Sequence, residues 1–477
     1  MSAFEFNLAP RDVPFVKTSN RVIGTKIPVP ESLLLIEEIK KYESSNAVEQ
    51  LPVVWGSAKN HQIFDEWGNA WIDFTSSIFV TNSGHANDET LLRIKECISK
   101  PLLHSYYYPT RIRAQFLKKL IEMTPVYLQK AIILSVGTEA TERAIKIARI
   151  YGQNKSKKKS IIVGGDGNYH GKTLGAQMIS GQHNDKGWIG YIDPNMKHMP
   201  FPFPWVIENF EGDGADLFKN HLDLMEKDGV NLKDIAAFFV ESFQGWGAVF
   251  YPIDYIKAMR EWCNENDALL VFDEIQAGFG RTGEMFAYQH YGVDADLVIC
   301  GKGISGSMPL SAVLGSSELI ELDAGYTSTH GGNPVACAAG LGNLEAFDNH
   351  NLIEESKRKG KIMKDIIDSW KVKYPSRIGR ILGNGMLYGV FITKENSDEL
   401  DNDIEEMKFG LSAIYEAYFW KSFNESMKKE IEIPIQTLVN MTSYWKGNQY
   451  INHANNVKKS MEEQTNIKCN ERELQIR

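Results

Sequence analysis

The chain has 477 residues and a mass of 53.9 kDa, a length that suits two or three structural units. Its composition is 43% hydrophobic, 24% charged and 11% aromatic, which excludes a disordered, collagen-like or disulfide-scaffold chain. With 52 Lys and Arg against 61 Asp and Glu, the formal net charge is −9, and this acidity disfavours nucleic acid as a partner.

The five cysteines are scattered without a CxxC pair, and the eleven histidines form no ligand cluster. We therefore expect a reducing compartment and no metal. Residues 1–12 contain no basic stretch followed by an apolar core, and no apolar run approaches the roughly 20 residues of a membrane span. The sequence predicts a soluble, cytoplasmic protein without a membrane partner.

The first elements along the chain look like an appendage to a larger domain. A proline-bounded arm at residues 26–31 precedes a predicted helix with apolar residues at 33, 34, 36 and 39. Residues 62–74 form two short alternating runs around a Glu-Trp-Gly-Asn turn, a pattern that predicts a β-hairpin.

From about residue 90 to 345, strand-length apolar runs alternate with helix-length amphipathic stretches. Such continuous apolar strands indicate a mostly parallel sheet covered by helices on both faces, so we predict a three-layer α/β domain. The predicted strands are residues 131–134, 160–163, 236–240, 268–272, 296–300 and 311–314, and predicted helices include 140–151 and 255–266.

Beyond residue 345 the chain becomes helix-rich and charged, with one predicted strand at 386–392. We expect three parts: an N-terminal arm with part of a small domain at 1–89, the large domain at 90–345, and the rest of the small domain at 346–477. The two outer parts together would form a smaller α+β domain.

Ionisable residues follow three of the predicted strands. Glu241, Asp273 and Lys302 each come at or just after a strand end, and in an open parallel sheet these ends share one rim where ligands bind. Lys302 lies in the small-residue segment Gly301-Lys-Gly303. A lysine beside an apolar strand end is disfavoured unless its charge is used or its pKa is lowered, and Schiff-base chemistry is a common use.

Two further segments have residues suited to a phosphate and a flat ring. Ser135-Val-Gly-Thr-Glu-Ala140 joins a strand to a helix, so N–H groups exposed at Gly137 and the Thr138 hydroxyl would bind an anion. Tyr169 follows another strand and would stack on a heterocycle. A phosphate site, an aromatic ring, a carboxylate and a lysine on one rim match the requirements of pyridoxal 5′-phosphate (PLP).

The sequence closely resembles the class III aminotransferases, the ω-amino acid, 4-aminobutyrate and acetylornithine group with PLP fold type I. The resemblance runs from about residue 55 to 342. It is strongest at Asp273-Glu-Ile-Gln-Ala-Gly-Phe-Gly-Arg-Thr-Gly283, at Gly301-Lys302, and at Thr329-His-Gly-Gly-Asn-Pro334.

This resemblance implies a role for each matching residue. Lys302 would be the Schiff-base lysine and Asp273 the partner of the pyridine nitrogen, and these two are the catalytic candidates. Thr329 would reach the phosphate of a partner subunit, so the resemblance implies a homodimer with shared active sites. The remaining cofactor-binding candidates are Gly137, Thr138, Tyr169, His170, Glu241 and Gln276.

Departures from the family pattern concern the substrate. The motif Glu241-Ser-Phe-Gln-Gly245 has Ser242 where relatives carry proline, and Trp246 stands where glutamate-using relatives carry a second glutamate. No arginine lies between Arg380 and Arg472 to bind an α-carboxylate, which argues against a plain glutamate and 2-oxoglutarate cycle. Lys172 replaces an arginine, and the match to the family is poor after about residue 394. Candidate substrate residues are Phe79, Lys172 and Trp246.

The sequence thus predicts PLP-dependent transfer of an amino group from an amine or ω-amino acid to an oxo acid. Two alternatives stay open. One is other PLP chemistry on the same fold, such as amino-acid epimerisation or decarboxylating transamination. The other is a non-catalytic PLP-binding protein.

Overall fold

The computed structural model describes residues 8–44, 51–325, 327–376 and 378–392. Its centre is a seven-stranded sheet of order β6-β14-β13-β12-β9-β7-β8. β14 pairs antiparallel with both neighbours, and the other pairs are parallel. The strands are β6 (Lys130–Leu134), β7 (Ile161–Gly165), β8 (Met196–Met199), β9 (Ile235–Glu241), β12 (Leu269–Asp273), β13 (Leu297–Cys300) and β14 (Ser311–Gly315).

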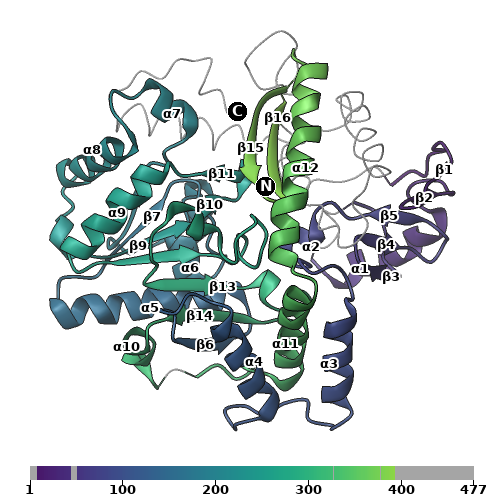
Figure 1. Cartoon of the computed structure of the whole chain (residues 1–477), viewed down its shortest axis with the longest axis horizontal. Coiled ribbons are helices and arrows are strands. Elements are labelled where there is room, and N and C mark those ends of the chain that lie inside the picture. Colours follow the sequence, from purple (N-terminus) through teal and green to yellow (C-terminus); the bar gives the residue numbers. More distant parts are fainter. Residues whose placement is uncertain (1–7, 45–50, 326, 377, 393–477) are drawn as a thin grey trace.

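Helices cover both faces of this sheet (Figure 1). On one face the inward side chains, such as Leu270 and Phe272, pack against α4 (Arg111–Glu122), α8 (Gly214–Lys227), α9 (Ile253–Glu265) and α11 (Pro334–Asn349). On the other face, Leu269 and Val271 pack against α5 (Gly137–Lys155), α6 (Leu174–Ile179) and α10 (Ser317–Ile320). Alternate residues of one strand thus enter two separate apolar cores, which is why the strands read as continuous apolar runs.

The predicted three-layer α/β domain is therefore confirmed, and each of the six predicted strands is present within a few residues. β8 was missed, because Met196-Lys-His-Met199, at the edge of the sheet, has two adjacent polar residues and no apolar run. No described helix is long and apolar enough to cross a membrane.

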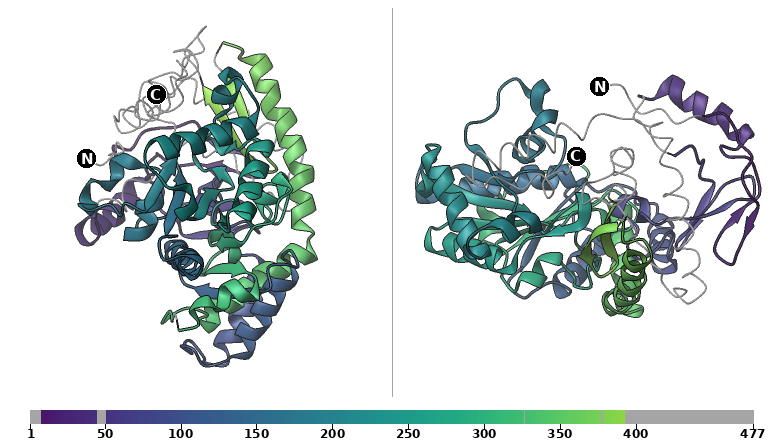
Figure 2. Two further views of the ribbon diagram at one scale, coloured as in Figure 1. Left: turned by 90° about the vertical axis from the view of Figure 1, so that its left-hand side faces the viewer. Right: turned by 90° about the horizontal axis from the view of Figure 1, so that it is seen from above.

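The N-terminal segment forms a separate small sheet of order β1-β2-β5-β4-β3. β4 (Gln62–Phe64) and β5 (Ala70–Ile72) are the predicted hairpin, and α1 (Leu33–Tyr42) is the predicted helix. The other strands are β1 (Val16–Lys17), β2 (Val22–Ile23) and β3 (Ser57–Lys59). This sheet lies beyond α2 (Ser76–Phe79) and α12 (Leu352–Lys373), at the opposite end of the molecule from α8 and α9 (Figures 1 and 2).

A small apolar core joins the two ends of the described chain. Trp370 and Met363 of α12 pack with residues of the hairpin β15 (Ile378–Asn384) and β16 (Leu387–Ile392), and Ile72 and Phe74 of the N-terminal part join them. The predicted strand at 386–392 is β16. α3 (Asp88–Ile98) packs along α11. The predicted three-part division itself stays a prediction, and the segment predicted to diverge after about residue 394 lies outside the described residues.

Candidate active site

Three neighbouring strands bring Glu241, Asp273 and Lys302 to one rim of the central sheet. β9, β12 and β13 lie side by side, with Asp273 opposite Glu241 on one side and opposite Ile299 on the other. Lys302 follows the last residue of β13 by two positions. Parallel strands end at the same edge, so the juxtaposition that the sequence predicted follows directly from strand direction.

Lys302 lies at the start of a tight turn with unusual backbone geometry. Its φ is 42°, in the left-handed region that a non-glycine residue adopts only when neighbours hold it there. One such neighbour is Asn343, whose Nδ2 donates to the Gly303 carbonyl at 2.8 Å. The Lys302 ammonium lies 5.8 Å from the centroid of the Phe79 ring. The turn therefore fixes where the amine emerges beside an aromatic wall.

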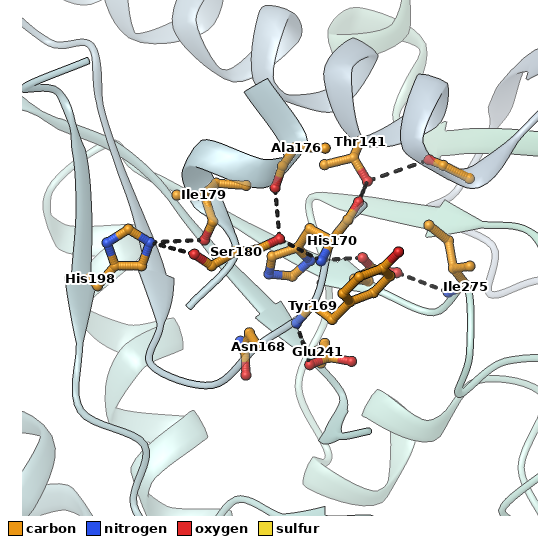
Figure 3. A network of polar contacts seen from close by, with 12 residues as sticks. Thr141, Asn168, Tyr169, His170, Ala176, Ile179, Ser180, His198, Glu241 and Ile275 are labelled. Atoms are coloured by element: carbon orange, nitrogen blue, oxygen red, sulfur yellow. Dashed lines mark hydrogen bonds and ion pairs between the residues drawn. The ribbon is translucent and has the colours of Figure 1, made fainter. Parts of the chain in front are cut away.

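The Asp273 carboxylate is buried and hydrogen-bonded on both oxygens. Oδ2 lies 2.8 Å from Nδ1 of His170, and Oδ1 accepts from the backbone N–H of Ile275 at 3.0 Å. A carboxylate only accepts, so Nδ1 of His170 carries the proton, and the opposite ring nitrogen is buried without a partner. His170 and Ile275 thus fix the plane of the carboxylate that faces the rim (Figure 3).

Glu241 lies beside this pair and binds the segment that carries Tyr169. Its Oε2 accepts from the backbone N–H of Tyr169 at 2.9 Å (Figure 3). Burial and the charge of Asp273 raise the pKa of Glu241 to about 8, while that N–H and the charge of Lys302 act in the opposite direction. Glu241 is thus close enough to Asp273 and Lys302 to interact with both charges, as the pairing of their strands implies.

Tyr169 and Gln276 lie next to Glu241. The Tyr169 side chain is 41% exposed, so its ring is open at the rim, and burial together with the charge of Glu241 raises the pKa of its hydroxyl. A Cβ on Gly245 would lie 2.8 Å from Oε1 of Gln276 and 3.2 Å from Oε1 of Glu241. The backbone at Gly245 thus lies close to the carboxyl and amide groups of both side chains.

The amino terminus of α5 lies at the same rim, because β6 runs parallel to β13 and leads into Gly137. A Cβ on Gly137 would lie 2.9 Å from Cδ1 of Ile275, so no larger residue fits without a shift. The Thr138 hydroxyl is 2.6 Å from that of Thr173. This helix end offers backbone N–H groups, a hydroxyl and the positive end of a 19-residue helix dipole to an anion.

Phe79 belongs to a strained turn that sequence reasoning did not find. Residues 76–79 all have positive φ, from 48° to 70°. Arg281, fully buried, donates through Nη2 to the Phe79 carbonyl at 2.7 Å and through Nε to the Gln276 carbonyl at 2.8 Å. Its guanidinium also lies 4.8 Å from the Phe79 ring centroid. Arg281 thus joins the Phe79 turn to the loop of Gln276, a role that its position in a glycine-rich polar segment could have suggested.

The remaining candidates are less closely placed. Lys172 and Thr329 are exposed, and Trp246 lies in the short 3-10 helix Trp246–Ala248, where its side chain is outside the described residues. In this single chain the structure therefore brings together the strand-end, helix-end and Tyr169 candidates, with Phe79 beside Lys302.

The sequence matches the family "Aminotransferase class-III" over residues 43–414, more than three-quarters of the chain. The chain belongs to this family. It is 29% identical to a 4-aminobutyrate aminotransferase of Mycobacterium leprae, covering 81% of this chain and 87% of that protein. It is 30% identical to an alanine/serine racemase of Pyrococcus horikoshii, covering 88% of this chain and 90% of that protein.

Solved structures of aminotransferases have the same fold. A taurine:2-oxoglutarate aminotransferase from Bifidobacterium kashiwanohense, in complex with PLP and glutamate, superposes with a TM-score of 0.75 at 22% identity, covering 87% of this chain and 99% of that one. An S-selective transaminase from Arthrobacter sp. with alanine bound gives 0.66 at 28%, covering 76% and 81%. This class III aminotransferase has the PLP fold type I architecture and uses PLP as its cofactor.

The residues at the rim fit that cofactor on structural grounds. A buried carboxylate with one hydrogen bond on each oxygen retains accepting capacity for a ring N–H. Gly137 and Gly301 both lie against Ile275, at 2.9 and 3.1 Å from a built Cβ, so the backbone approaches closely where a ligand needs room. The start of α5 has free backbone N–H groups suited to an anion, and Lys302 carries an amine at the same rim.

Proposed function

We propose that Lys302 is the lysine that binds PLP covalently and that Asp273 pairs with its pyridine nitrogen. The observation that supports both assignments is the arrival of Glu241, Asp273 and Lys302 at one rim, beside the amino terminus of α5. When bound, PLP supplies a ring that accepts electrons from the substrate carbon being deprotonated. In this chain, Lys302 holds and moves the proton at that carbon.

His170 orients the Asp273 carboxylate. The imidazole donates its Nδ1 proton to Oδ2, so the carboxylate stays an acceptor and keeps the ring nitrogen of the cofactor protonated. With the cofactor bound, Tyr169 would stack on the ring, Gln276 would contact its oxygen, and Gly137 and Thr138 would hold the phosphate. Glu241, with its pKa near 8, is largely protonated at neutral pH and adds little negative charge to the site.

The test of this assignment is spectroscopic. Purified protein with PLP is expected to show the visible absorption of a lysine-bound cofactor, and an amine donor is expected to abolish it. Lys302→Ala removes the covalent bond, so the band is lost, whereas the exposed Lys158→Ala serves as a matched control and retains it. A visible band of unchanged intensity in Lys302→Ala would contradict the assignment.

We propose that the substrates are an amine or ω-amino acid and an oxo acid, with Phe79, Lys172 and Trp246 at the substrate. The Phe79 ring beside the Lys302 ammonium supports an apolar wall over the reacting amine. Arg380, the last arginine before Arg472, forms a bidentate pair with Glu208 at 2.7 and 2.8 Å. Its guanidinium is engaged by Glu208, and this supports weak binding of an acceptor that carries a second carboxylate.

An acceptor screen tests the substrate proposal. We expect pyruvate to regenerate the PLP form faster than 2-oxoglutarate, by roughly tenfold or more. 2-Oxoglutarate carries a second carboxylate that pyruvate lacks, and a carboxylate without a bidentate cationic partner is costly to desolvate. Absorbance in single-turnover mixing measures this rate. Equal or faster reaction with 2-oxoglutarate would refute the proposed acceptor preference.

Racemisation is a second candidate, supported by the similarity to the racemase of Pyrococcus horikoshii. Both reactions begin by removing the same proton, so the rim residues alone do not distinguish them. Incubation with a single enantiomer of alanine separates them. An oxo product that accumulates with the acceptor supports transamination, and conversion to the opposite enantiomer without an oxo product supports racemisation.

We propose that the protein works as a homodimer in which Thr329 completes the phosphate site of the partner. Thr329 is exposed in the single chain. The loop before it is tied to an apolar surface: the backbone N–H of Ser328 donates to the Tyr107 hydroxyl, near the exposed Leu103 and Tyr108. Exposed apolar side chains of this kind mark interaction sites. A cytoplasmic location stays part of the proposal.

A further inference from the structure

One face of α5 contacts the segment that carries the ring-binding residues. Thr138, Thr141 and Glu142 are spaced i, i+3 and i+4 and so lie on one side of the helix. Glu142 Oε1 accepts from the Thr173 hydroxyl at 2.6 Å and from the backbone N–H groups of residues 175 and 176 at 2.9 and 3.1 Å. The segment 169–176 is therefore fixed to the same helix whose amino terminus forms the anion site.

On this face of α5, Thr141 contacts His170, the residue that pairs with Asp273. Its hydroxyl, which is fully buried, donates to the main-chain carbonyl of His170 at 2.9 Å (Figure 3). On the other side of the same residue, the backbone N–H of His170 donates to the Ser180 hydroxyl, also at 2.9 Å. The hydroxyls of Thr141 and Ser180 thus bind the backbone carbonyl and N–H of His170, and the His170 side chain contacts Asp273.

We propose that Thr141 is a positioning residue for the cofactor ring. By holding the His170 carbonyl, it sets the distance between the phosphate end of α5 and the His170–Asp273 pair, and therefore the tilt of the ring between them. This inference rests on the proposed function, because it takes Gly137, Thr138 and Asp273 as the residues that hold PLP.

The hydrogen bond, rather than the shape of the side chain, carries this role. Valine has nearly the shape of threonine but cannot donate, so Thr141→Val leaves a buried carbonyl unpaired. Thr141→Ser retains the donor. Thr90 is a matched control, because it is also buried and its hydroxyl has no hydrogen-bond partner. Thr90→Val therefore removes a hydroxyl without breaking a hydrogen bond.

The experiment compares these variants as full-length protein reconstituted with PLP. We expect Thr141→Val to release PLP about tenfold faster, to lower the visible circular dichroism of the bound cofactor, and to shift the pH midpoint of its absorption band. Thr141→Ser and Thr90→Val are expected to stay within about twofold of the wild type in release rate. A purely structural role would lower thermal stability and leave the pH midpoint unchanged.

Two results would overturn the inference: a Thr141→Val protein with wild-type dichroism and pH midpoint, or a Thr141→Ser protein as impaired as Thr141→Val. If Thr141→Val does not fold, Ser180→Ala is the second variant. It removes the hydroxyl that accepts from the backbone N–H of His170 and is expected to give the same spectral change. Wild-type protein that binds no PLP, or binds it without Lys302, would instead refute the proposed function.

Discussion

At the scale of single residues, the buried carboxyl groups of Glu241 and Glu274 lie at the ends of the neighbouring strands β9 and β12. Glu274, next to Asp273, is completely buried and accepts from the Ser242 hydroxyl at 2.5 Å and from two backbone N–H groups, of residues 287 and 288, at 3.0 and 2.8 Å. Burial raises its pKa to about 7 despite these donors. Ser242 stands where relatives carry proline, and in this chain its hydroxyl is a partner for Glu274. The departure from the family pattern thus has a structural role.

The raised pKa values of Glu241 and Glu274 predict how the free energy of unfolding depends on pH. The native pKa values of Glu241 and Glu274, about 8 and 7, exceed the ordinary value of 4.5, so the native state binds more protons than the unfolded state between pH 4.5 and 8. Their contribution to the free energy of unfolding therefore falls as pH rises. The buried His198 and His221 have lowered pKa values and oppose this trend below about 6.5, and Lys186, whose pKa is lowered by burial to about 8, opposes it toward pH 8. The contribution of Glu274 is therefore measured as the difference in slope between two proteins.

Glu274→Gln tests this sign. Denaturant unfolding of the cofactor-free protein at several pH values from 6.5 to 8 is expected to show a shallower loss of stability in the variant than in the wild type. The exposed Glu226→Gln is the matched control and is expected to retain the wild-type slope. Equal slopes in Glu274→Gln and the wild type would show that Glu274 is not protonated as described.

At the scale of elements, the start of α5 is positioned by one side chain. Ile275 packs against Gly137 at the helix start and against Gly301 at the end of β13. The helix amino terminus, the Asp273 loop and the Lys302 turn therefore meet around a single isoleucine. A Cβ would lie 2.9 Å from Ile275 at Gly137 and 3.1 Å at Gly301, so both glycines allow this side chain to pack closely between the helix start and the lysine turn.

A methyl group at residue 137 is expected to displace the helix start. Gly137→Ala places Cβ 2.9 Å from Cδ1 of Ile275, so we expect PLP affinity to fall by roughly tenfold, about 1.4 kcal/mol. Ile275→Ala removes the obstructing atoms, so the double variant is expected to recover part of the affinity. Titration of PLP followed by absorbance measures both.

The control for this substitution is Gly187→Ala, where a built Cβ meets nothing within 4 Å and affinity should not change. If Gly137→Ala binds PLP as tightly as the wild type, the helix start does not hold the phosphate in the way proposed.

At the scale of the whole molecule, parts far apart in the sequence share one core. Ile72 and Phe74 pack with α12 and the β15–β16 hairpin, and the Phe79 turn that follows them reaches the rim of the large domain. The Phe79 ring itself packs with Phe243, Ala277 and Ala287 of the large domain, so the turn links the two cores. Thr329 is exposed, as the proposed shared phosphate site requires.

Combining two impaired variants in one dimer tests whether the active site is shared between subunits. Lys302→Ala lacks the lysine and Thr329→Ala weakens the phosphate site of the partner. In a mixed dimer, one site carries both changes and the other carries neither. We therefore expect mixed dimers, formed by co-expression with two different tags, to recover up to half of the wild-type activity per dimer.

Failure to recover activity in isolated mixed dimers, or elution of active protein as a monomer, would refute the shared site. The two single variants, purified alone, provide the baseline.

Much of the fold was predictable because its signals are local. Five of the seven central strands are buried on both faces and β6 is an apolar run at one edge, and their order in the sequence predicted which residues reach the rim. The Asp273 and Lys302 motifs were recognisable because their spacing from strand ends is short. β8 was not predicted, since an edge strand with Lys197 and His198 lacks the apolar run of a central one.

The contacts that position the site were not predictable, because their partners are distant in the sequence. Arg281 contacts Phe79, which lies 202 positions earlier in the chain, and nothing in the sequence around Phe79 indicates a left-handed turn. Thr141 reads as one polar residue on a helix until His170, 29 positions later, is placed beside it.

The sequence alone determined the family, the cofactor and the set of side chains that parallel strands deliver to one edge, since strand direction and strand ends are local properties. Only the tertiary structure decided how those side chains are held: which donors bind Asp273, which glycines face Ile275, and which hydroxyls hold His170. These features depend on packing between elements, and packing fixes distances that no local pattern records.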